Sequence, residues 1–423
     1  MKEEFLHYLW KNKLYDSLKL RAINDFPIVV LNSGIHNQNT GPDFLNSKIE
    51  IAHQVWFGNV EIHLKSSDWY AHRHETDENY DAVILHVVWE HDEDVYMKNN
   101  MPIPTLELKQ YVDQKLLEKY NQLDQQSLRW IPCEKEINAI DSFLFNNWLE
   151  RLFIERLERK SILINELLRE SKNDWEYVMF CLLAKNFGLK VNGDAFLDLA
   201  KSISYSVIRK EQSSFDVLSA LFFGQAGFLS ESIEEPYHAH LKKEYDYLRR
   251  KYELVSYLKN SFQFFRMRPS NFPTVRIAQL AALYSKYQSV FSEVTKVKAI
   301  NEFYQLFKIE VSGFWNTHYN FTKESKRNKK GFTKSFLDLL FINTIIPLQF
   351  SYQKTMNTLN EESLFEMMKA VKSEKNSIIS KFSELKVTAK NAFESQALLE
   401  LKNNYCASKR CLECAIGNQL LKN

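Results

Sequence analysis

Acidic, basic and imidazole side chains share one face of a predicted β-strand in the stretch VEIHLK, residues 60–65. Because side chains alternate between the two faces of a strand, Glu61, His63 and Lys65 point one way and the apolar residues between them point the other. Asp43 ends the turn NTGPD before the preceding strand, so its carboxylate can approach that of Glu61. Two neighbouring carboxylates repel each other, and Mg²⁺ or Mn²⁺ relieves this repulsion. We therefore expect Asp43 and Glu61 to bind such a metal.

This arrangement would suit hydrolysis of a phosphodiester. The metal would lower the pKa of a bound water, while Lys65 or His63 would stabilise the attacking hydroxide or the charge that develops on the phosphate. The predicted catalytic residues are therefore Asp43, Glu61, His63 and Lys65. A structural alternative stays open: Asp43 caps a turn, and Glu61 pairs with Lys65 or Arg73 across a half-solvated sheet.

Histidines are concentrated early in the chain, because eight of the eleven precede residue 92. His72 and His74 lie two residues apart in the polar loop HRHETD, close in sequence to several acidic residues. They could form a second, softer site for Zn²⁺ or Mn²⁺, or supply a general acid, although loop histidines are commonly just solvated. His86, within VILHVVW, is expected to face inward and to need a hydrogen-bond partner.

Three cysteines form a C-x4-C-x2-C array in YCASKRCLECAIG, residues 405–417. The C-x2-C step of Cys411 and Cys414 suits a metal held by two thiolates, with Cys406 as a third ligand and the distant Cys133 as a fourth. Zn²⁺ or a four-iron, four-sulfide cluster would satisfy four thiolates. Reduced, half-buried thiols are the alternative. Cys181, in an apolar helical stretch, is expected to be a core residue.

Two basic segments are candidates for contact with a phosphate backbone. In FFRMRPSNFPTVRIAQL, Arg266, Arg268 and Arg276 alternate with phenylalanines, a combination that clamps the backbone and stacks bases in nucleic-acid channels. The same combination also occurs where arginines pack between helices. The segment KESKRNKKGFTK, residues 323–334, is the second candidate and could equally be a solvated loop.

The elements that position these residues follow from the period of the apolar side chains. A helix is expected over residues 3–12, and then strands over 27–34, 47–52, 56–65, 82–89 and 104–109. From residue 141 the pattern is helical, with stretches at 145–170, 174–188, 196–208, 214–229, 276–291 and 361–382. The sequence therefore predicts an α+β fold, with a sheet domain over residues 1–130 and a larger helical domain over residues 141–423.

Composition limits the function classes. The 423 residues carry 55 Lys and Arg against 53 Asp and Glu, so no global charge attracts nucleic acid or an anionic membrane, and any basic surface must be local. No signal peptide and no membrane span is evident, and five cysteines do not form a disulfide framework, so a cytoplasmic location is expected. The absence of the Walker A, G-x-G-x-x-G, H-E-x-x-H and G-x-S-x-G motifs argues against ATP-, NAD- and serine-dependent chemistry.

Pro42-Asp43 followed by an acid on the next strand, Glu61, resembles the PD-(D/E)xK nuclease superfamily. The resemblance implies a Mg²⁺- or Mn²⁺-dependent nuclease acting on DNA or RNA, with a further acid from the first helix, here Glu3 or Glu4. The sequence departs from the motif because His63 stands where the family has lysine, and Lys65 follows two residues later. A literal Glu-x-Lys occurs at Glu107–Lys109 and ranks second. Some related nucleases hold an iron–sulfur cluster with cysteines from distant parts of the chain.

A longer resemblance spans nearly the whole chain. Residues 58–92, the arginine segment and the cysteine segment are similar to a bacterial family defined only as a domain of unknown function, which implies no activity. Two other hypotheses therefore accompany the nuclease: a noncatalytic nucleic-acid-binding or scaffold protein, and a metallohydrolase of small substrates that uses the histidines.

Overall fold

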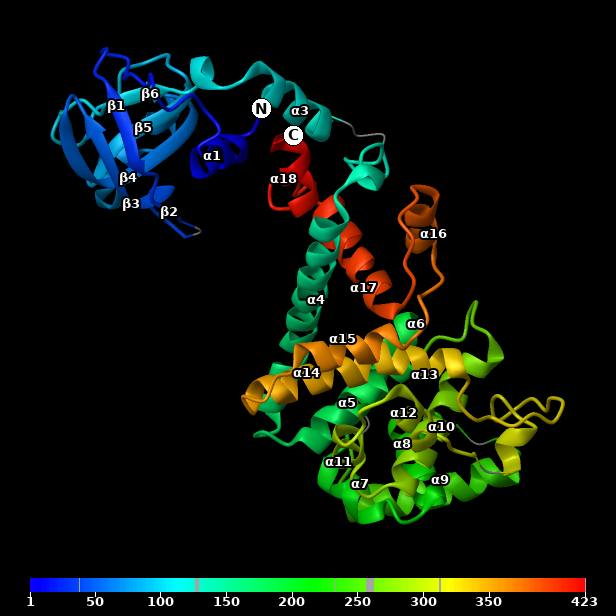
Figure 1. Cartoon of the computed structure of the whole chain (residues 1–423). Coiled ribbons are helices and arrows are strands. Elements are labelled where there is room, and N and C mark those ends of the chain that lie inside the picture. Colours follow the sequence, from blue (N-terminus) through cyan, green and yellow to red (C-terminus); the bar gives the residue numbers. More distant parts are fainter. Residues whose placement is uncertain (38, 126–128, 232, 256–261, 312, 423) are drawn as a thin grey trace. The chain divides into compact units, whose positions relative to one another are not determined.

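The computed structural model describes residues 1–423 except 38, 126–128, 232, 256–261, 312 and 423. Its contacts divide the chain into unit 1, Met1–Trp148 with Leu401–Asn423, and unit 2, Leu149–Glu400. The fold is α+β, as predicted, with the sheet in unit 1 and helices throughout unit 2 (Figure 1). Residues 401–423, which the sequence analysis placed with the helical domain, group with unit 1 because α18 (Ala415–Lys422) packs on α3 (Gln114–Gln125).

Unit 1 contains a six-stranded mixed sheet. Its strand order is β1-β3-β4-β5-β6, with β2 beside β3. The pairs β1–β3, β2–β3 and β3–β4 are antiparallel, whereas β4–β5 and β5–β6 are parallel. The bounds are Ile28–Asn32 (β1), Ile35–His36 (β2), Phe44–Ile51 (β3), Gln54–Lys65 (β4), Val83–Glu90 (β5) and Thr105–Glu107 (β6). All five predicted strands are present.

The β3–β4 hairpin sets the register of the candidate catalytic residues. Ile51 pairs with Gln54, and the two residues between them, Ala52 and His53, have φ angles of 52° and 67°. Positive φ at both positions is typical of the two-residue turn whose twist matches that of antiparallel strands. At the other end of the hairpin Phe44 pairs with Val60, which brings the residues next to them together.

Helix α1 (Glu3–Asn12) packs against β4 and buries its apolar face, Phe5, Leu6, Leu9 and Trp10. The connection from β4 to β5 contains α2 (Asp68–Ala71) and the short helices η1 (His74–Thr76) and η2 (Glu78–Tyr80). Asp92 holds the start of this connection in place, because it accepts hydrogen bonds from the hydroxyl of Ser66 and from the amide and hydroxyl of Ser67. The loop that carries His72 and His74 is thus attached to the C-terminal ends of β4 and β5.

The rest of unit 1 is helical. Helices η3 (Lys109–Tyr111), α3 and η4 (Ile137–Ala139) lead into α4 (Ser142–Glu170), which continues into unit 2. The C-terminal part of the unit is a π-helix, η8 (Leu401–Cys406), followed by α18. Among the described residues, no helix is long and apolar enough to cross a membrane.

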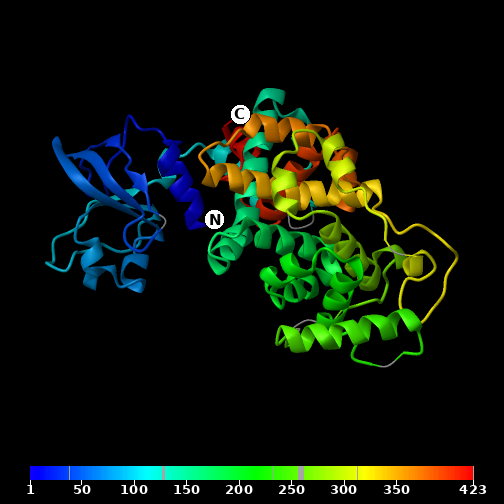
Figure 2. The same cartoon turned by 90° about the horizontal axis from the view of Figure 1, so that it is seen from below.

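Unit 2 consists of helices around α5 (Trp175–Phe187) and α10 (Pro273–Lys286), both of which are buried on nearly all sides. Helix α9 lies at the margin of this unit (Figure 1, Figure 2). The remaining bounds are Leu189–Lys201 (α6), Tyr205–Glu211 (α7), Phe215–Gln225 (α8), Pro236–Lys251 (α9), Pro269–Asn271 (η5), Val290–Thr295 (α11), Ile300–Leu306 (α12), Gly313–Asn316 (η6), Lys334–Leu340 (α13), Phe341–Ile345 (η7, a π-helix), Ile346–Thr355 (α14), Glu361–Lys369 (α15), Ser377–Glu384 (α16) and Ala392–Glu400 (α17).

The sequence analysis treated the stretch 361–382 as one helical segment, and it forms two helices. Lys372 makes a β-bridge with Asn391, which takes the backbone out of the helical conformation after α15. Asn376 then caps α16 by accepting hydrogen bonds from the amides of Ile378 and Ile379. A local cap and a long-range bridge therefore interrupt an apolar pattern that is continuous in the sequence.

Candidate metal centre

Asp43 and Glu61 meet at the open end of the β3–β4 hairpin. The amide of Asp43 donates a hydrogen bond to Oε2 of Glu61 at 3.1 Å, and the amide of Ile62 donates to Oδ2 of Asp43 at 2.9 Å. Glu61 is only 4% exposed. Burial, with the nearby charge of Asp43, raises the pKa of Glu61 to about 9. The expected approach of these two residues from neighbouring strands is therefore observed.

Three histidines gather beside Glu61. Nε2 of His63 lies 3.1 Å from Nδ1 of His72. One ring nitrogen each from His63, His72 and His74 lies within 4.8 Å of the other two. Oε1 of Glu61 is 3.5 Å from Nε2 of His63 and 3.3 Å from Nε2 of His74. The strand β4 supplies two of these groups and the loop before β5 supplies the others.

These separations fit a single metal ion. Around Zn²⁺ with nitrogen ligands at about 2.0–2.1 Å, tetrahedral ligand atoms lie roughly 3.3 Å apart. The buried Nε2 of His74 makes no hydrogen bond to any described residue, as expected for a ligand atom. His72 is exposed, so the group is open to solvent on one side. The ligand set is then three imidazoles, with Glu61 offering an oxygen beside two of them.

The local electrostatics favour the neutral form of His63, His74 and His86, and neutral imidazole is the form that binds metal. Burial, and then the neighbouring histidines, lower the pKa of His63 to about 2. Burial also lowers the pKa of His86 to about 3 and lowers that of His74.

His86 on β5 holds the His63 ring. Nδ1 of His63 lies 2.9 Å from Nε2 of His86. If Nδ1 of His63 carries the proton, it donates a hydrogen bond to Nε2 of His86. Nε2 of His63 then keeps the lone pair that faces His72 and His74. His86 has no exposed surface, and its inward position agrees with the sequence-based expectation.

Asp43 also contacts His7, a residue that the sequence analysis did not identify. Nε2 of His7 lies 3.2 Å from Oδ2 of Asp43 and 3.9 Å from Oε1 of Glu3, one turn earlier on α1. Burial opposes protonation of His7, but the hydrogen bond and charge of Asp43 and the charge of Glu3 outweigh it, and the pKa of His7 is raised. The i, i+4 spacing of Glu3 and His7 on a predicted helix was the available signal.

Lys65 does not join this group. It lies at the exposed end of β4, where Nζ is 3.8 Å from Oδ2 of Asp92, and its amide donates to Asp68. Asp92, just after β5, is therefore the acid beside the Lys65 side chain, and the catalytic role of Lys65 stays a prediction. The Glu-x-Lys motif at residues 107–109, which ranked second, also lies outside the histidine group. Its Glu107 is on β6 and accepts a hydrogen bond from the amide of His91.

The three predicted nucleic-acid-binding arginines lie in unit 2 and differ in exposure. Arg266 and Arg268 are exposed, whereas Arg276 is 4% exposed. The guanidinium of Arg276 donates to Asn271 and Gln279 and lies 3.4 Å from the centre of the Phe336 ring. Arg276 therefore packs between helices, as the alternative reading held, and is not placed to contact a phosphate backbone.

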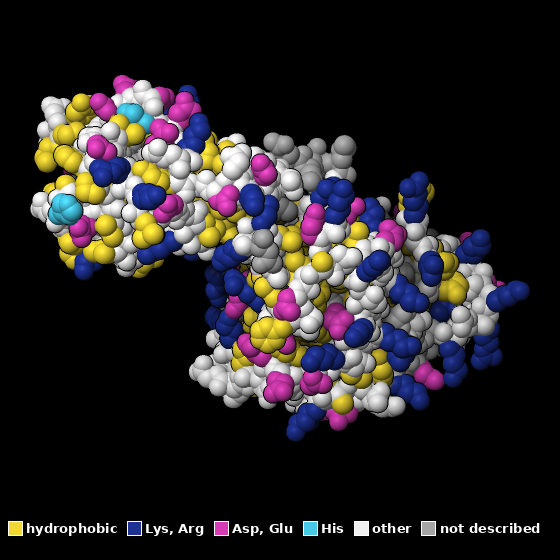
Figure 3. Space-filling model, turned by 45° about the horizontal axis from the view of Figure 1, so that its top comes forward, with side chains coloured by type: hydrophobic (Ala, Val, Ile, Leu, Met, Phe, Trp, Pro, Cys, Tyr) yellow, Lys and Arg dark blue, Asp and Glu magenta, His cyan; other side chains and the backbone are white. Residues whose placement is uncertain are grey.

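The lysine-rich segment 323–334 is mostly exposed, in keeping with either reading of it. Its exception is Lys330, which is 5% exposed and lies over the Tyr319 ring. On the face shown in Figure 3, Lys and Arg side chains are interspersed with Asp and Glu, in agreement with the near-neutral net charge.

Cys133, Cys406, Cys411 and Cys414 line one small pocket of unit 1. None of them is in a disulfide. The expected convergence of Cys133 with the C-terminal cysteines is therefore observed, and Cys181 is a buried residue of α5 in unit 2.

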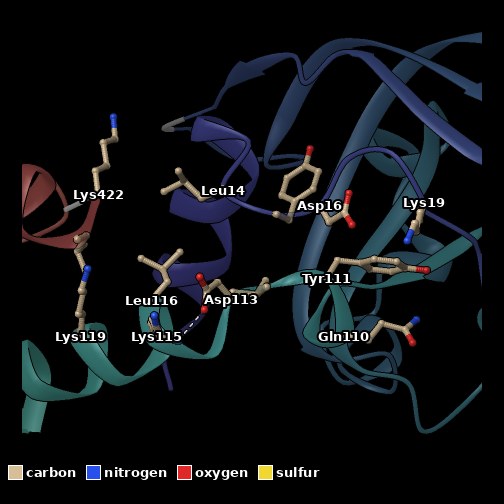
Figure 4. A pocket seen from close by; sticks show the side chains of 13 residues that line it. Leu14, Asp16, Lys19, Gln110, Tyr111, Asp113, Lys115, Leu116, Lys119 and Lys422 are labelled. Atoms are coloured by element: carbon tan, nitrogen blue, oxygen red, sulfur yellow. Dashed lines mark hydrogen bonds between the residues drawn. The ribbon is translucent and has the colours of Figure 1, made fainter.

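A cleft of about 750 Å³ in unit 1 is separate from the histidine group and contains none of its residues. Figure 4 shows Lys119 of α3 and Lys422 of α18 at one end of it, and Lys19, Asp16 and Tyr111 at the other. With Lys115 and Asp113, the lining has four lysines and two aspartates.

Comparisons with known proteins identify a family but no activity. No curated protein and no solved structure matches the chain. One family model, described as a protein of unknown function, matches residues 3–377, so the cysteine segment at 405–417 lies beyond it. The histidine group and the arginine segment lie within the match, which covers most of the chain. The chain therefore belongs to the DUF2851 family of proteins of unknown function.

Proposed function

We propose that this protein is a metal-dependent hydrolase that cleaves phosphodiester bonds in DNA or RNA, with its metal held by His63, His72, His74 and Glu61. The observation that carries the proposal is the convergence of three imidazole nitrogens within 4.8 Å, beside a buried carboxylate. A divalent ion bound there would lower the pKa of a ligated water and attract an anionic oxygen of the substrate.

The residues of the chain have separate roles in this proposal. His63, His72 and His74 provide nitrogen ligands, and Glu61 provides oxygen. Asp43 holds the Glu61 carboxylate through its amide, which leaves Oε1 of Glu61 directed at the histidines. His7, whose Nε2 lies 3.2 Å from Oδ2 of Asp43, is positioned to hold or transfer a proton at that nitrogen.

The ligand types bear on the choice of metal. Imidazole ligands suit Zn²⁺ and other transition metals, whereas Mg²⁺ prefers a set made of oxygens. A site with three histidines and one carboxylate therefore favours Zn²⁺ or Mn²⁺ over Mg²⁺.

Two features support a phosphodiester as the substrate. The pair Pro42-Asp43 with Glu61 on the adjacent strand retains part of the nuclease motif, although His63 replaces its lysine. The separate cleft in unit 1 has two more lysines than aspartates, which favours a polyanion. A small-substrate hydrolase would need the histidine group but not this cleft.

The test combines metal analysis with cleavage assays. The full chain is stripped with a chelator, reloaded with Zn²⁺, Mn²⁺ or Mg²⁺, and incubated with plasmid DNA, single-stranded DNA and RNA. We expect about one bound Zn²⁺ or Mn²⁺ at the histidines and cleavage that His74→Ala and Glu61→Gln abolish. His53→Asn is the matched control, because His53 is exposed on the hairpin turn and asparagine tolerates its positive φ.

Each failure has a distinct meaning. Metal binding lost in His74→Ala, with no cleavage of any nucleic acid by the wild-type chain, would support the centre and overturn the phosphodiester assignment. Salt-sensitive nucleic-acid binding without metal or cleavage would indicate the noncatalytic binding protein instead.

A further inference from the structure

Four of the five cysteines lie together in unit 1, although Cys133 is more than 270 residues away from the others in sequence. Cys133 follows α3, Cys406 ends η8, and Cys411 and Cys414 lie in the turn before α18. None of the four forms a disulfide. The fold thus assembles a set of thiols from both ends of the unit.

The surroundings of these thiols are closed and largely apolar. Pro132, Leu401, Tyr405 and Gly417 line the same pocket. Burial, and then the charges of the other cysteines, raise the pKa of Cys133 and of Cys406. The shared pocket is what groups the four thiols, and burial without a metal would keep them unreactive.

The backbone before α18 is shaped around Cys411 and Cys414. Gly417 lets the chain approach the carbonyl of Cys411, since a Cβ atom at residue 417 would lie 2.1 Å from that oxygen. A glycine here permits the tight turn that presents both sulfurs.

The spacing of the sulfurs distinguishes between metals. Four thiolates at about 2.3 Å from one Zn²⁺ ion would lie roughly 3.8 Å apart. Among the described residues, the group whose ligand atoms lie within 4.8 Å of one another is the histidine group, and no three of these cysteines form a second one. An iron–sulfur cluster places several iron and sulfide atoms between its thiolates, so it is ligated by cysteine sulfurs that lie farther apart than those around one Zn²⁺ ion.

We propose that Cys133, Cys406, Cys411 and Cys414 ligate a four-iron, four-sulfide cluster, which joins the segment after α3 to the segment before α18. On ligation each thiol loses its proton to solvent, and the preassembled cluster binds without a change in its oxidation state. The cluster serves structure: it holds α18 against α3, and these two helices supply Lys119 and Lys422 to the lysine-lined cleft.

The direct test uses the full chain purified without oxygen. We expect a brown protein with about four iron and four sulfide per chain. One zinc per chain and no iron would overturn the cluster, and so would a metal-free chain with four alkylatable cysteines. This measurement is independent of the histidine centre, because His74→Ala should keep its iron.

Variants then assign the ligands. Cys133→Ser and Cys411→Ser should each lose most of the iron, whereas Cys181→Ser, which alters the cysteine of α5, should retain all of it. If a ligand variant fails to fold, removing the cluster from the wild-type chain with a chelator and an oxidant gives the same comparison. Amide hydrogen exchange in residues 415–422 should then rise at least tenfold, and unchanged exchange would refute the structural role.

Discussion

Asp43 and Glu61 are joined by reciprocal contacts across the β3–β4 hairpin: the Asp43 amide donates to the Glu61 carboxylate, and the amide next to Glu61 donates to the Asp43 carboxylate. Each acid is therefore fixed by the backbone of the other strand. Oε1 of Glu61 is left to face His63 and His74, whereas Oδ2 of Asp43, which accepts from the Ile62 amide, also lies 3.2 Å from Nε2 of His7. The register of this hairpin thus places the pair Asp43 and His7 next to the group of His63, His72 and His74.

His86→Phe should weaken metal binding by roughly 10- to 100-fold, the usual cost of losing a group that orients a histidine ligand. The phenyl ring fills the space but leaves Nδ1 of His63 without its partner. Metal titration of the stripped chain measures the effect. His86→Gln, which keeps an acceptor, should recover part of the affinity, and equal affinity in all three chains would mean that His86 does not position His63.

Arg276→Ala should lower the free energy of unfolding by roughly 2–4 kcal/mol, because two hydrogen-bond partners and the Phe336 ring lose the guanidinium. Nucleic-acid binding by the folded variant should change less than twofold. Arg266→Ala and Arg268→Ala, at exposed positions, should leave the melting temperature nearly unchanged. A large loss of binding in Arg276→Ala with normal stability would return this residue to a direct role.

Because of Lys160, the free energy of unfolding of unit 2 should vary with pH in the alkaline range. Burial, together with Arg156, Arg159 and Lys185 and despite Glu400, lowers the pKa of Lys160 to about 8. The unfolded chain therefore binds this proton more tightly, so stability falls as pH decreases from about 10.5 towards 8 and stays lower below that.

Lys160→Met should therefore stabilise the protein at pH 7 by about 1–2 kcal/mol, a value discounted for the partial exposure of the side chain. The gain should vanish near pH 10.5. Denaturant melts of Lys160→Met and of the exposed control Lys190→Met, compared at both pH values, provide the measurement. A gain that is independent of pH would attribute the effect to packing.

Gly224→Ala should destabilise the pair α8 and α9 by roughly 1–3 kcal/mol. A Cβ atom at this position would lie 2.1 Å from the ring of Tyr245. Thermal melts check the loss, and the double variant Gly224→Ala/Tyr245→Leu should regain part of it because the smaller side chain makes room. A single variant as stable as the wild type would show that α9 moves away at little cost.

The sequence by itself determined the local elements. The opening helix and all five expected strands are present, because apolar periods of 3.6 and 2 act over a few residues. The meeting of Asp43 and Glu61 was also predictable, since a short hairpin connects their strands and fixes the register. Even the convergence of Cys133 with the three C-terminal cysteines could be proposed from thiol count and spacing.

Only the tertiary structure decided which polar groups share a space. It brought His72 and His74 from a loop to His63, added His7 from α1, and turned Lys65 towards Asp92. It also buried Arg276 against Phe336 in unit 2. Side-chain direction at a strand end or in a loop depends on partners distant in sequence, and local periodicity carries no information about them. Tertiary packing therefore determines the candidate metal centre, whereas the local spacing of apolar residues determines the strands that support it.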